Sequence, residues 1–489
     1  MPDLGFEDPP LPRIEIAATT FAFENAKLIQ LLKLRGAAIK TDKFDEMRKI
    51  DAEINDYKNK NLEHVTRPCS VFMTFENEEG YQRAVQFDEI VTKSTIPEVR
   101  DLKGWLGDQD IEIQAASEPS DIIWENRHWT PWQRTKGEIV AALVIGAALA
   151  LSFAIVFVGR KMQAGVYAKY PVPASCQPFY DNYGDQLESF AVLDYEANTK
   201  LESEGRDPSY AGYLQCFCDQ QAADGMASDA PYGPDGAQIC ADYSFYAYLA
   251  LGIGNAITGF IVVVNTLLTE LAIGLITWIG YDTHSEMLTK ITNGVFLAQF
   301  FNTALVLLLV EANFSETFTF AAGAFNGAYP DYVPSWYEVT GDTFVQTMLI
   351  NAFFPVIMQV IADLQVWLFR RMDQGWEKDP MERLYKTKLT QVSQYVEMYS
   401  GPPYIVHFKY SSVFNCVYVT MLYGVGLPIM FPIAVLTFAI FWSLERYHMA
   451  YSYRLPPSLD DKLTKNAVRV LKFSPVMLLA NGYWMLSQS

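Results

Sequence analysis

The 489-residue sequence is poor in histidine and cysteine, with five and six residues respectively. Its five histidines are scattered along the chain, and we find no nucleophile paired with a base. Neither a phosphate-binding glycine loop nor a metal-ligand spacing is present. The sequence therefore predicts a protein that is not an enzyme and holds no cofactor and no metal. The five are His64, His128, His284, His407 and His448.

Positive charge is also in short supply. Lysine and arginine number 37 against 56 aspartate and glutamate, which gives a formal net charge of −19. Because nucleic-acid binding rests on neutralising phosphates, this balance argues against a nucleic-acid partner. The segment Val71–Phe75 looks like the aromatic strand of an RNA-recognition module. No basic patch surrounds it, so we interpret its rings as core or partner-packing residues.

Long hydrophobic runs, by contrast, are abundant. Half of the residues are hydrophobic, and they alternate with polar blocks instead of spreading evenly. This partition predicts a polytopic α-helical membrane protein, since a span takes roughly 20 mostly apolar residues. The expected spans are 138–158, 244–278, 291–311, 342–370, about 409–423, a sixth that ends near 444, and a seventh run at 473–486.

Residues 1–136 read as an N-terminal α+β domain. Strands are expected at 13–19, 67–75 and 110–114, and helices at 21–34, 43–61 and 78–84. The order of these elements favours a ferredoxin-like, RRM-like arrangement. Because the chain changes side at each predicted span, residues 371–408 and 445–472 lie on the same side of the membrane as this domain. Both segments are rich in basic residues, so we place the domain in the cytosol.

Four of the six cysteines fall in the acidic loop 163–242, which we place outside the cell. Two disulfides are expected there, with their pairing open, and a metal site is the alternative. The sequon at Asn313 predicts glycosylation on the same side. The domain plan is thus 1–136, a first span at 137–162, the loop, a five-span pore region at 243–446, an interfacial segment at 447–472 and a partial span at 473–489. The loop cysteines are Cys176, Cys216, Cys218 and Cys240.

Polar residues recur inside three consecutive spans. In 342–370 they fall on every fourth position, which makes one slowly drifting stripe on a helix. Polar side chains at membrane depth survive only against protein or a wet cavity. Interhelical hydrogen bonds are the alternative reading, but stripes at several depths favour the lining of a pore. The predicted pore-lining residues are Asn255, Asn265, Glu270, Gln299, Asn302, Asn351, Gln359 and Asp363.

Pro355 interrupts the middle of that stripe. Proline removes a helical hydrogen bond, so a hinge is expected here, with a static kink as the alternative. Ile350 and Phe354, with their apolar neighbours, are the expected gate, which would close by excluding water. The carboxylates Glu270 and Asp363, together with the acidic loop, would favour cations.

Five segments resemble the OSCA-type family of hyperosmolality-gated, calcium-permeable channels, which are distant relatives of the anoctamins. They are Arg67-Pro…Val71-Phe-Met-Thr-Phe75, Pro119-Ser-Asp-Ile-Ile-Trp-Glu-Asn126, Ala298-Gln-Phe-Phe-Asn-Thr-Ala304, Gly424-Val-Gly-Leu-Pro-Ile-Met-Phe-Pro-Ile-Ala434 and Arg454-Leu-Pro-Pro-Ser-Leu-Asp460. Each is short, but together they occur in the family's order over most of the chain.

The resemblance implies an anoctamin-like bundle that is incomplete here. Family members have eleven membrane helices, so this chain resembles a fragment that begins in the cytosolic domain. The family's pore lies within each subunit, between the helices matching the first five spans, and subunits pair as dimers through the cytosolic domain. The implied function is an osmotically or mechanically gated channel of the plasma membrane that passes Ca²⁺, K⁺ and Na⁺. Its implied partners are the surrounding membrane lipids. A phospholipid scramblase and a non-conducting scaffold are the alternatives.

Overall fold

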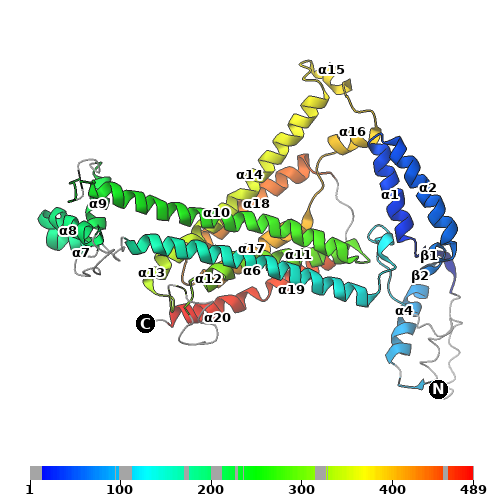
Figure 1. Cartoon of the computed structure of the whole chain (residues 1–489). Helices are drawn as coiled ribbons and strands as arrows, with labels where there is room; N and C mark the ends of the chain where they lie inside the picture. Colours follow the sequence, from blue (N-terminus) through cyan, green and yellow to red (C-terminus); the bar gives the residue numbers. More distant parts are fainter. Residues whose placement is uncertain are drawn as a thin grey trace.

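The protein is a mostly helical molecule with a small α/β part at one end and a group of short helices at the other (Figure 1). The structure, a computed structural model, describes residues 14–93, 95–97, 113–169, 176–199, 212–225, 230–234, 236–313, 327, 329–454 and 461–487. Long helices between the two ends form the bundle that contains the largest hydrophobic core.

Among the residues that the structure describes, four helical segments are long and apolar enough to span a membrane. They are Pro131–Val166, Ile239–Ile279, His284–Glu311 and Pro334–Asp373. The first lies in α6 (Pro131–Lys169) and the second is α10 (Ile239–Ile279). The third comprises α11 (His284–Phe300), the π-helical segment η7 (Phe301–Leu305) and α12 (Val306–Glu311). The fourth comprises α13 (Pro334–Trp336), the π-helical segment η9 (Tyr337–Gly341) and α14 (Asp342–Asp373).

The other three predicted spans correspond to shorter helices of the same bundle. α17 (Val406–Tyr423) packs on α11 and on α20 (Ser474–Leu486), and α18 (Met430–Tyr451) packs on α14. Their crossing of a membrane stays a prediction. The short helices α15 (Pro380–Tyr385), α16 (Val392–Tyr399) and α19 (Lys462–Leu471) connect the bundle helices.

The N-terminal part pairs β1 (Ile16–Phe23) antiparallel with β2 (Pro68–Phe75). Around this ribbon lie α1 (Ala26–Lys40), α2 (Phe44–Lys60), α3 (Leu62–Val65) and α4 (Glu78–Lys93). Phe21 pairs with Val71, so the expectation of a helix from residue 21 was wrong: β-favouring Thr19, Thr20 and Phe21 extend the strand instead. Of the expected third strand, residues 110–112 lie outside the described part, and Ile113 and Gln114 are in no strand.

The segment Pro119–Trp129, which includes the turn η2 (Trp124–Asn126), joins this part to the bundle. The carboxylate of Asp121 accepts hydrogen bonds from the amide (2.8 Å) and hydroxyl (2.9 Å) of Ser285, at the start of α11. Arg134 pairs with Asp282 in the same turn. On its other side, the ring of Trp124 packs on Phe72 with centroids 5.0 Å apart. The aromatic strand therefore contributes to packing at this junction.

The described parts of the cysteine loop form a helical unit with its own core. It contains α7 (Gln177–Tyr183), η3 (Gly184–Gln186), α8 (Leu187–Thr199) and α9 (Tyr213–Ala223), packed on the start of α10. Cys176 is bonded to Cys216, and Cys218 to Cys240. The two predicted disulfides are thus confirmed, and their pairing, which the sequence left open, is settled.

One buried ion pair holds several bundle helices together. Arg160 of α6 and Glu311 of α12 are 7% and 6% exposed, and Nε lies 3.0 Å from Oε1. The same guanidinium donates to Thr343 of α14 (2.9 Å) and to Gln163 (2.7 Å). Gln163 in turn donates to the carbonyl of Ala250 on α10 (3.2 Å). A charge at this depth is tolerated because Glu311 supplies the counter-charge and Thr343 and Gln163 accept hydrogen bonds from the guanidinium.

Glu311→Gln should therefore lower the free energy of unfolding by about 3 kcal/mol or more, because it leaves a buried guanidinium without its counter-charge. Denaturant unfolding in a fixed detergent measures the loss. Asp56→Asn, which breaks an exposed pair with Lys60, is the control and should cost less than about 0.5 kcal/mol. Equal effects of the two substitutions would contradict this role of the pair.

Candidate functional site

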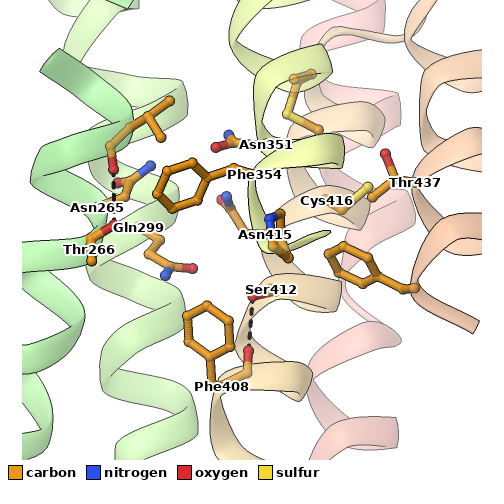
Figure 2. A pocket seen from close by; sticks show the side chains of 14 residues that line it. Asn265, Thr266, Gln299, Asn351, Phe354, Phe408, Ser412, Asn415, Cys416 and Thr437 are labelled. Carbon is orange, nitrogen blue, oxygen red and sulfur yellow. Dashed lines mark hydrogen bonds between the residues drawn. The ribbon is translucent and has the colours of Figure 1, made fainter. Parts of the chain in front are cut away.

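A small internal cavity lies where five bundle helices meet: α10, α11, α14, α17 and α18. Figure 2 shows Asn265 and Gln299 on one side, Asn415, Cys416 and Thr437 on the other, and Asn351 and Phe354 of α14 between them. The lining residues are Val262, Asn265, Thr266, Gln299, Met348, Asn351, Phe354, Pro355, Phe408, Ser412, Asn415, Cys416, Thr437 and Phe441.

This cavity is suited to hold water. Its volume is about 70 Å³, whereas one water needs about 10–15 Å³ by the same kind of measure. Two buried amide atoms in its lining, Nδ2 of Asn351 and Oδ1 of Asn415, have no hydrogen-bond partner among the described residues. A donor and an acceptor left unpaired at this depth would each be costly in a dry cavity. We infer that several waters occupy the space.

One wall of the cavity is fixed by a hydrogen-bonded network around Asn302. This side chain is fully buried; it accepts from Ser152 of α6 (2.6 Å) and donates to Asn265 (2.9 Å) and to the carbonyl of Ile261 (3.2 Å) on α10. Asn265 donates to Thr303 (2.8 Å). Asn302 and Thr303 lie in the π-helical segment η7, whose extra residue per turn sets the direction of their side chains.

A second pair of bonds extends the same wall. Gln299 donates to the hydroxyl of Thr269 (2.9 Å), which donates to the backbone carbonyl of Asn265 (2.7 Å). Asn265 and Gln299 are only 8% and 7% exposed, yet both reach the cavity. These two residues therefore combine the two readings that the sequence left open: they tie helices together and they line a wet space.

The lining also contains phenylalanine rings from three helices: Phe354 of α14, Phe408 of α17 and Phe441 of α18. Together with Pro355 they add apolar surface to a cavity that is also lined by amide and hydroxyl groups. The described lining carries no ionised side chain, so the site is polar but electrically neutral.

Pro355 divides α14 into two unlike halves. Before it, Thr343, Phe344, Thr347, Met348 and Ala352 are buried; after it, only Asp373 is. The helix nevertheless continues through the proline, and in Figure 1 its second half (yellow) leads away from the main bundle toward α15. The cavity lies where these halves meet. The first half is therefore anchored in the core, and the second is held by few neighbours.

The predicted site residues do not all meet. Asn265, Gln299, Asn351, Phe354 and Pro355 line the cavity. Asn302 stands behind the wall in the network, and Asn255 and Glu270 are exposed on other faces of α10. Ile350 is 40% exposed and does not line the cavity.

Gln359 and Asp363 lie farther along α14. Gln359 donates to Asp363 (3.3 Å) and accepts from the hydroxyl of Tyr453 (3.3 Å), while His448 lies 3.8 Å from Asp363. Asp363 lines a second and larger cavity at the end of α14. Asn313 hydrogen-bonds to Tyr329 through its backbone amide, but the rest of its sequon lies outside the described residues.

Sequence reasoning missed the contribution of α17 and α18. Phe408, Ser412 and Cys416 recur at every fourth position, as do Thr437 and Phe441. That spacing places each set on one helix face and could have been read from the sequence. The signal was overlooked because Ser, Cys and Thr are weakly polar and common in membrane helices.

No protein-family model matches the chain, and no curated protein matches it.

The two asparagines, Asn302 and Asn415, should respond differently to substitution. Asn302→Leu removes three hydrogen bonds, and at about 0.6 kcal/mol for each such bond in membrane proteins the loss is about 2 kcal/mol. Asn415→Leu removes an acceptor, Oδ1, that has no hydrogen-bond partner among the described residues, and it should cost less than about 0.5 kcal/mol. Denaturant unfolding in a fixed detergent compares the two. A larger loss for Asn415→Leu would contradict a water-filled cavity.

Proposed function

We propose that this chain forms the pore of an osmotically or mechanically gated cation channel that passes Ca²⁺, K⁺ and Na⁺. The observation that carries the proposal is the neutral cavity between helices of the bundle, three of which belong to candidate membrane spans, with the unpaired amide atoms of Asn351 and Asn415. Amide and hydroxyl oxygens can replace part of an ion's hydration shell, which a purely structural bundle does not require. The likeness of the five sequence segments to OSCA-type channels supports the same function.

The gate in this proposal is α14. Its first half is packed in the core, its second half is largely exposed, and Pro355 removes a backbone hydrogen bond between them. A tilt of the second half would move Pro355, at the boundary between the two halves, relative to the other lining residues and widen the neutral cavity. Membrane tension favours whichever state occupies more area, so a modest tilt at this point would couple tension to opening.

A phospholipid scramblase is the second candidate, for one reason. The polar residues of α14 continue past the cavity through Gln359 and Asp363 to a larger, polar cavity at the helix end. Such a row could also lead a lipid headgroup along the bundle surface. Reconstitution of the full chain into liposomes with labelled lipids distinguishes the two functions. The channel predicts tension-dependent current without lipid exchange, and lipid exchange without current would overturn it.

The same proposal places the protein in the plasma membrane and residues 1–136 in the cytosol. It also pairs two subunits through that domain. The membrane and the pairing follow from the resemblance, and the cytosolic position follows also from the distribution of basic residues along the sequence.

Pro355→Ala should shift the membrane tension that half-opens the channel. Alanine restores an amide donor at this position, straightens the helix and stabilises whichever state has the straighter α14. Patch recording of proteoliposomes under graded suction measures the threshold. Pro432→Ala is the matched control, because Pro432 lies in the first turn of α18, where no helical bond is lost. An unchanged threshold for Pro355→Ala, or an equal shift for both, would refute the hinge.

Asn351→Lys should lower cation conductance, because it places a fixed positive charge against a neutral cavity. At about 4 Å and an effective dielectric constant of about 20, the repulsion is ~4 kcal/mol, enough for a tenfold or larger fall. Single-channel recording measures the current, and reversal potentials measure the cation-to-chloride permeability ratio. Asn351→Asp, with the opposite charge at the same position, should raise that ratio. If neither variant changes the ratio, Asn351 does not line the path.

A further inference from the structure

A cavity of about 480 Å³ lies at the C-terminal end of α14, between that helix, the segment after α16 and the end of α18. It is separate from the neutral cavity described above and shares no lining residue with it. The lining residues are Asp363, Val366, Trp367, Arg370, Arg371, Gln374, Arg383, Tyr399, Ser400, Gly401, Pro402, Tyr451, Ser452 and Tyr453. We call it the arginine pocket.

Three guanidinium groups face the arginine pocket without a carboxylate partner among the described residues. Arg370 donates to the carbonyls of Met398 (3.1 Å) and Tyr399 (3.3 Å), and Arg371 to that of Glu377 (3.3 Å). The side chain of Arg383 makes no ion pair or hydrogen bond with the described part of the chain; its backbone amide donates to the carbonyl of Asp379 (3.0 Å). A guanidinium has five N–H donors, so most of the donors of all three side chains remain available. The backbone bonds hold Arg370 and Arg371 in place without neutralising them.

Two nearby acidic groups, Asp373 and Glu377, are not in the pocket lining. Asp373 accepts from Thr387 (3.1 Å), the amide of Lys388 (2.9 Å) and the hydroxyl of Tyr399 (2.9 Å), and among the described residues it makes no ion pair with the arginines. Glu377 pairs with Lys386 at 2.8 Å.

Asp363 is the carboxylate in the pocket lining. It lies near His448 and Gln359, and it precedes all three arginines in the sequence. Three positive charges against one negative charge leave the arginine pocket with a surplus of two, which attracts anions.

The surroundings place the pocket at the depth of lipid headgroups. It lies at the end of a helix long and apolar enough to span a membrane. Trp367, Trp376 and Tyr451 around it are 51%, 57% and 79% exposed. Exposed tryptophan and tyrosine at the end of an apolar helix are typical of the membrane–water interface. A phosphate carried by a lipid therefore lies within reach of the three arginines.

We propose that the arginine pocket binds a phosphate-bearing polyanion of the inositol-phosphate class. Guanidinium groups match phosphate oxygens with paired hydrogen bonds, which makes arginine the preferred residue for this anion. The volume falls in the range of roughly 300–1,000 Å³ typical of small-molecule sites, so it accommodates a sugar-like ring with more than one phosphate. The same chemistry occurs in a membrane lipid and in its free headgroup.

Occupancy of the pocket would act on α14 directly. Arg370 bonds the backbone of α16, and Lys40 of α1 pairs with Glu397 of the same short helix. A polyanion bridging Arg370, Arg371 and Arg383 would hold the end of α14 against α16 and thereby against the N-terminal part. This site would set the resting position of the helix whose tilt opens the channel in the proposed function.

The test is binding to the purified full chain in detergent, which needs no channel activity. Native mass spectrometry measures the bound fraction of short-chain phosphatidylinositol bisphosphate, of free inositol trisphosphate and of short-chain phosphatidylcholine. We expect both phosphorylated inositols to bind and phosphatidylcholine not to bind at the same concentration. Tighter binding of the lipid than of its headgroup identifies a membrane source; equal binding identifies a soluble one. Absence of binding by both phosphorylated ligands overturns the proposal.

Arg383→Gln is the decisive variant, because no described contact of the fold depends on this side chain. Losing one charge-assisted interaction should weaken binding about tenfold. Lys378→Gln removes an equal charge from an exposed residue outside the pocket and is the matched control. Unchanged binding by Arg383→Gln, or an equal loss with Lys378→Gln, overturns the assignment of the pocket. If binding passes these controls but no current is recorded, the binding site is supported and the proposed channel function is contradicted.

Discussion

The amide network around Asn302 is the constraint on which the arrangement of the bundle depends. A polar side chain inside a membrane helix must find a partner, and Asn302 finds three, on α6 and α10. The π-helical segment η7 directs this side chain and Thr303 toward α10 at the same level. These bonds fix α6, α10 and α11 against one another, so one wall of the neutral cavity is rigid and any change in its shape must come from the other wall.

The rest of the lining comes from α14, α17 and α18. Of these helices, α14 is tied back at its end to the N-terminal part through a chain of contacts. Arg370 binds the backbone of α16, and Gln391 and Gln394 donate to the carbonyls of Ile39 (3.1 Å) and Lys40 (3.0 Å) at the end of α1. Lys33 of α1 pairs with Glu125, in the segment docked on the turn before α11. The N-terminal part thus links the free end of α14 to the rigid side of the bundle. Motion of α14 must either strain this chain or move the domain with it.

Hydrophobic runs and helical periodicity predict most of the helices, and the β2 strand, close to where the structure has them. The site was harder to predict, because a small error in the assumed helical period changes the predicted direction of each side chain more with every turn. Glu270 follows Asn265 by five residues, which is about 140° around an α-helix, so it could not share its face. For Asn302 the α-helical period itself fails, since η7 changes the phase. The cysteine pairing needed three-dimensional proximity that spacing cannot supply.

The stripe on α14 is better understood as two sites than as one. Asn351 and Pro355 face a small neutral cavity between five helices, whereas Asp363 and Arg370 face a larger, positively charged one at the helix end. Gln359 lies between them and bonds both Asp363 and Tyr453. In the proposed channel, a positively charged vestibule would repel the cations that a neutral pore would admit. An anion bound among the three arginines would remove that conflict, and the two sites of α14 then become compatible with one path.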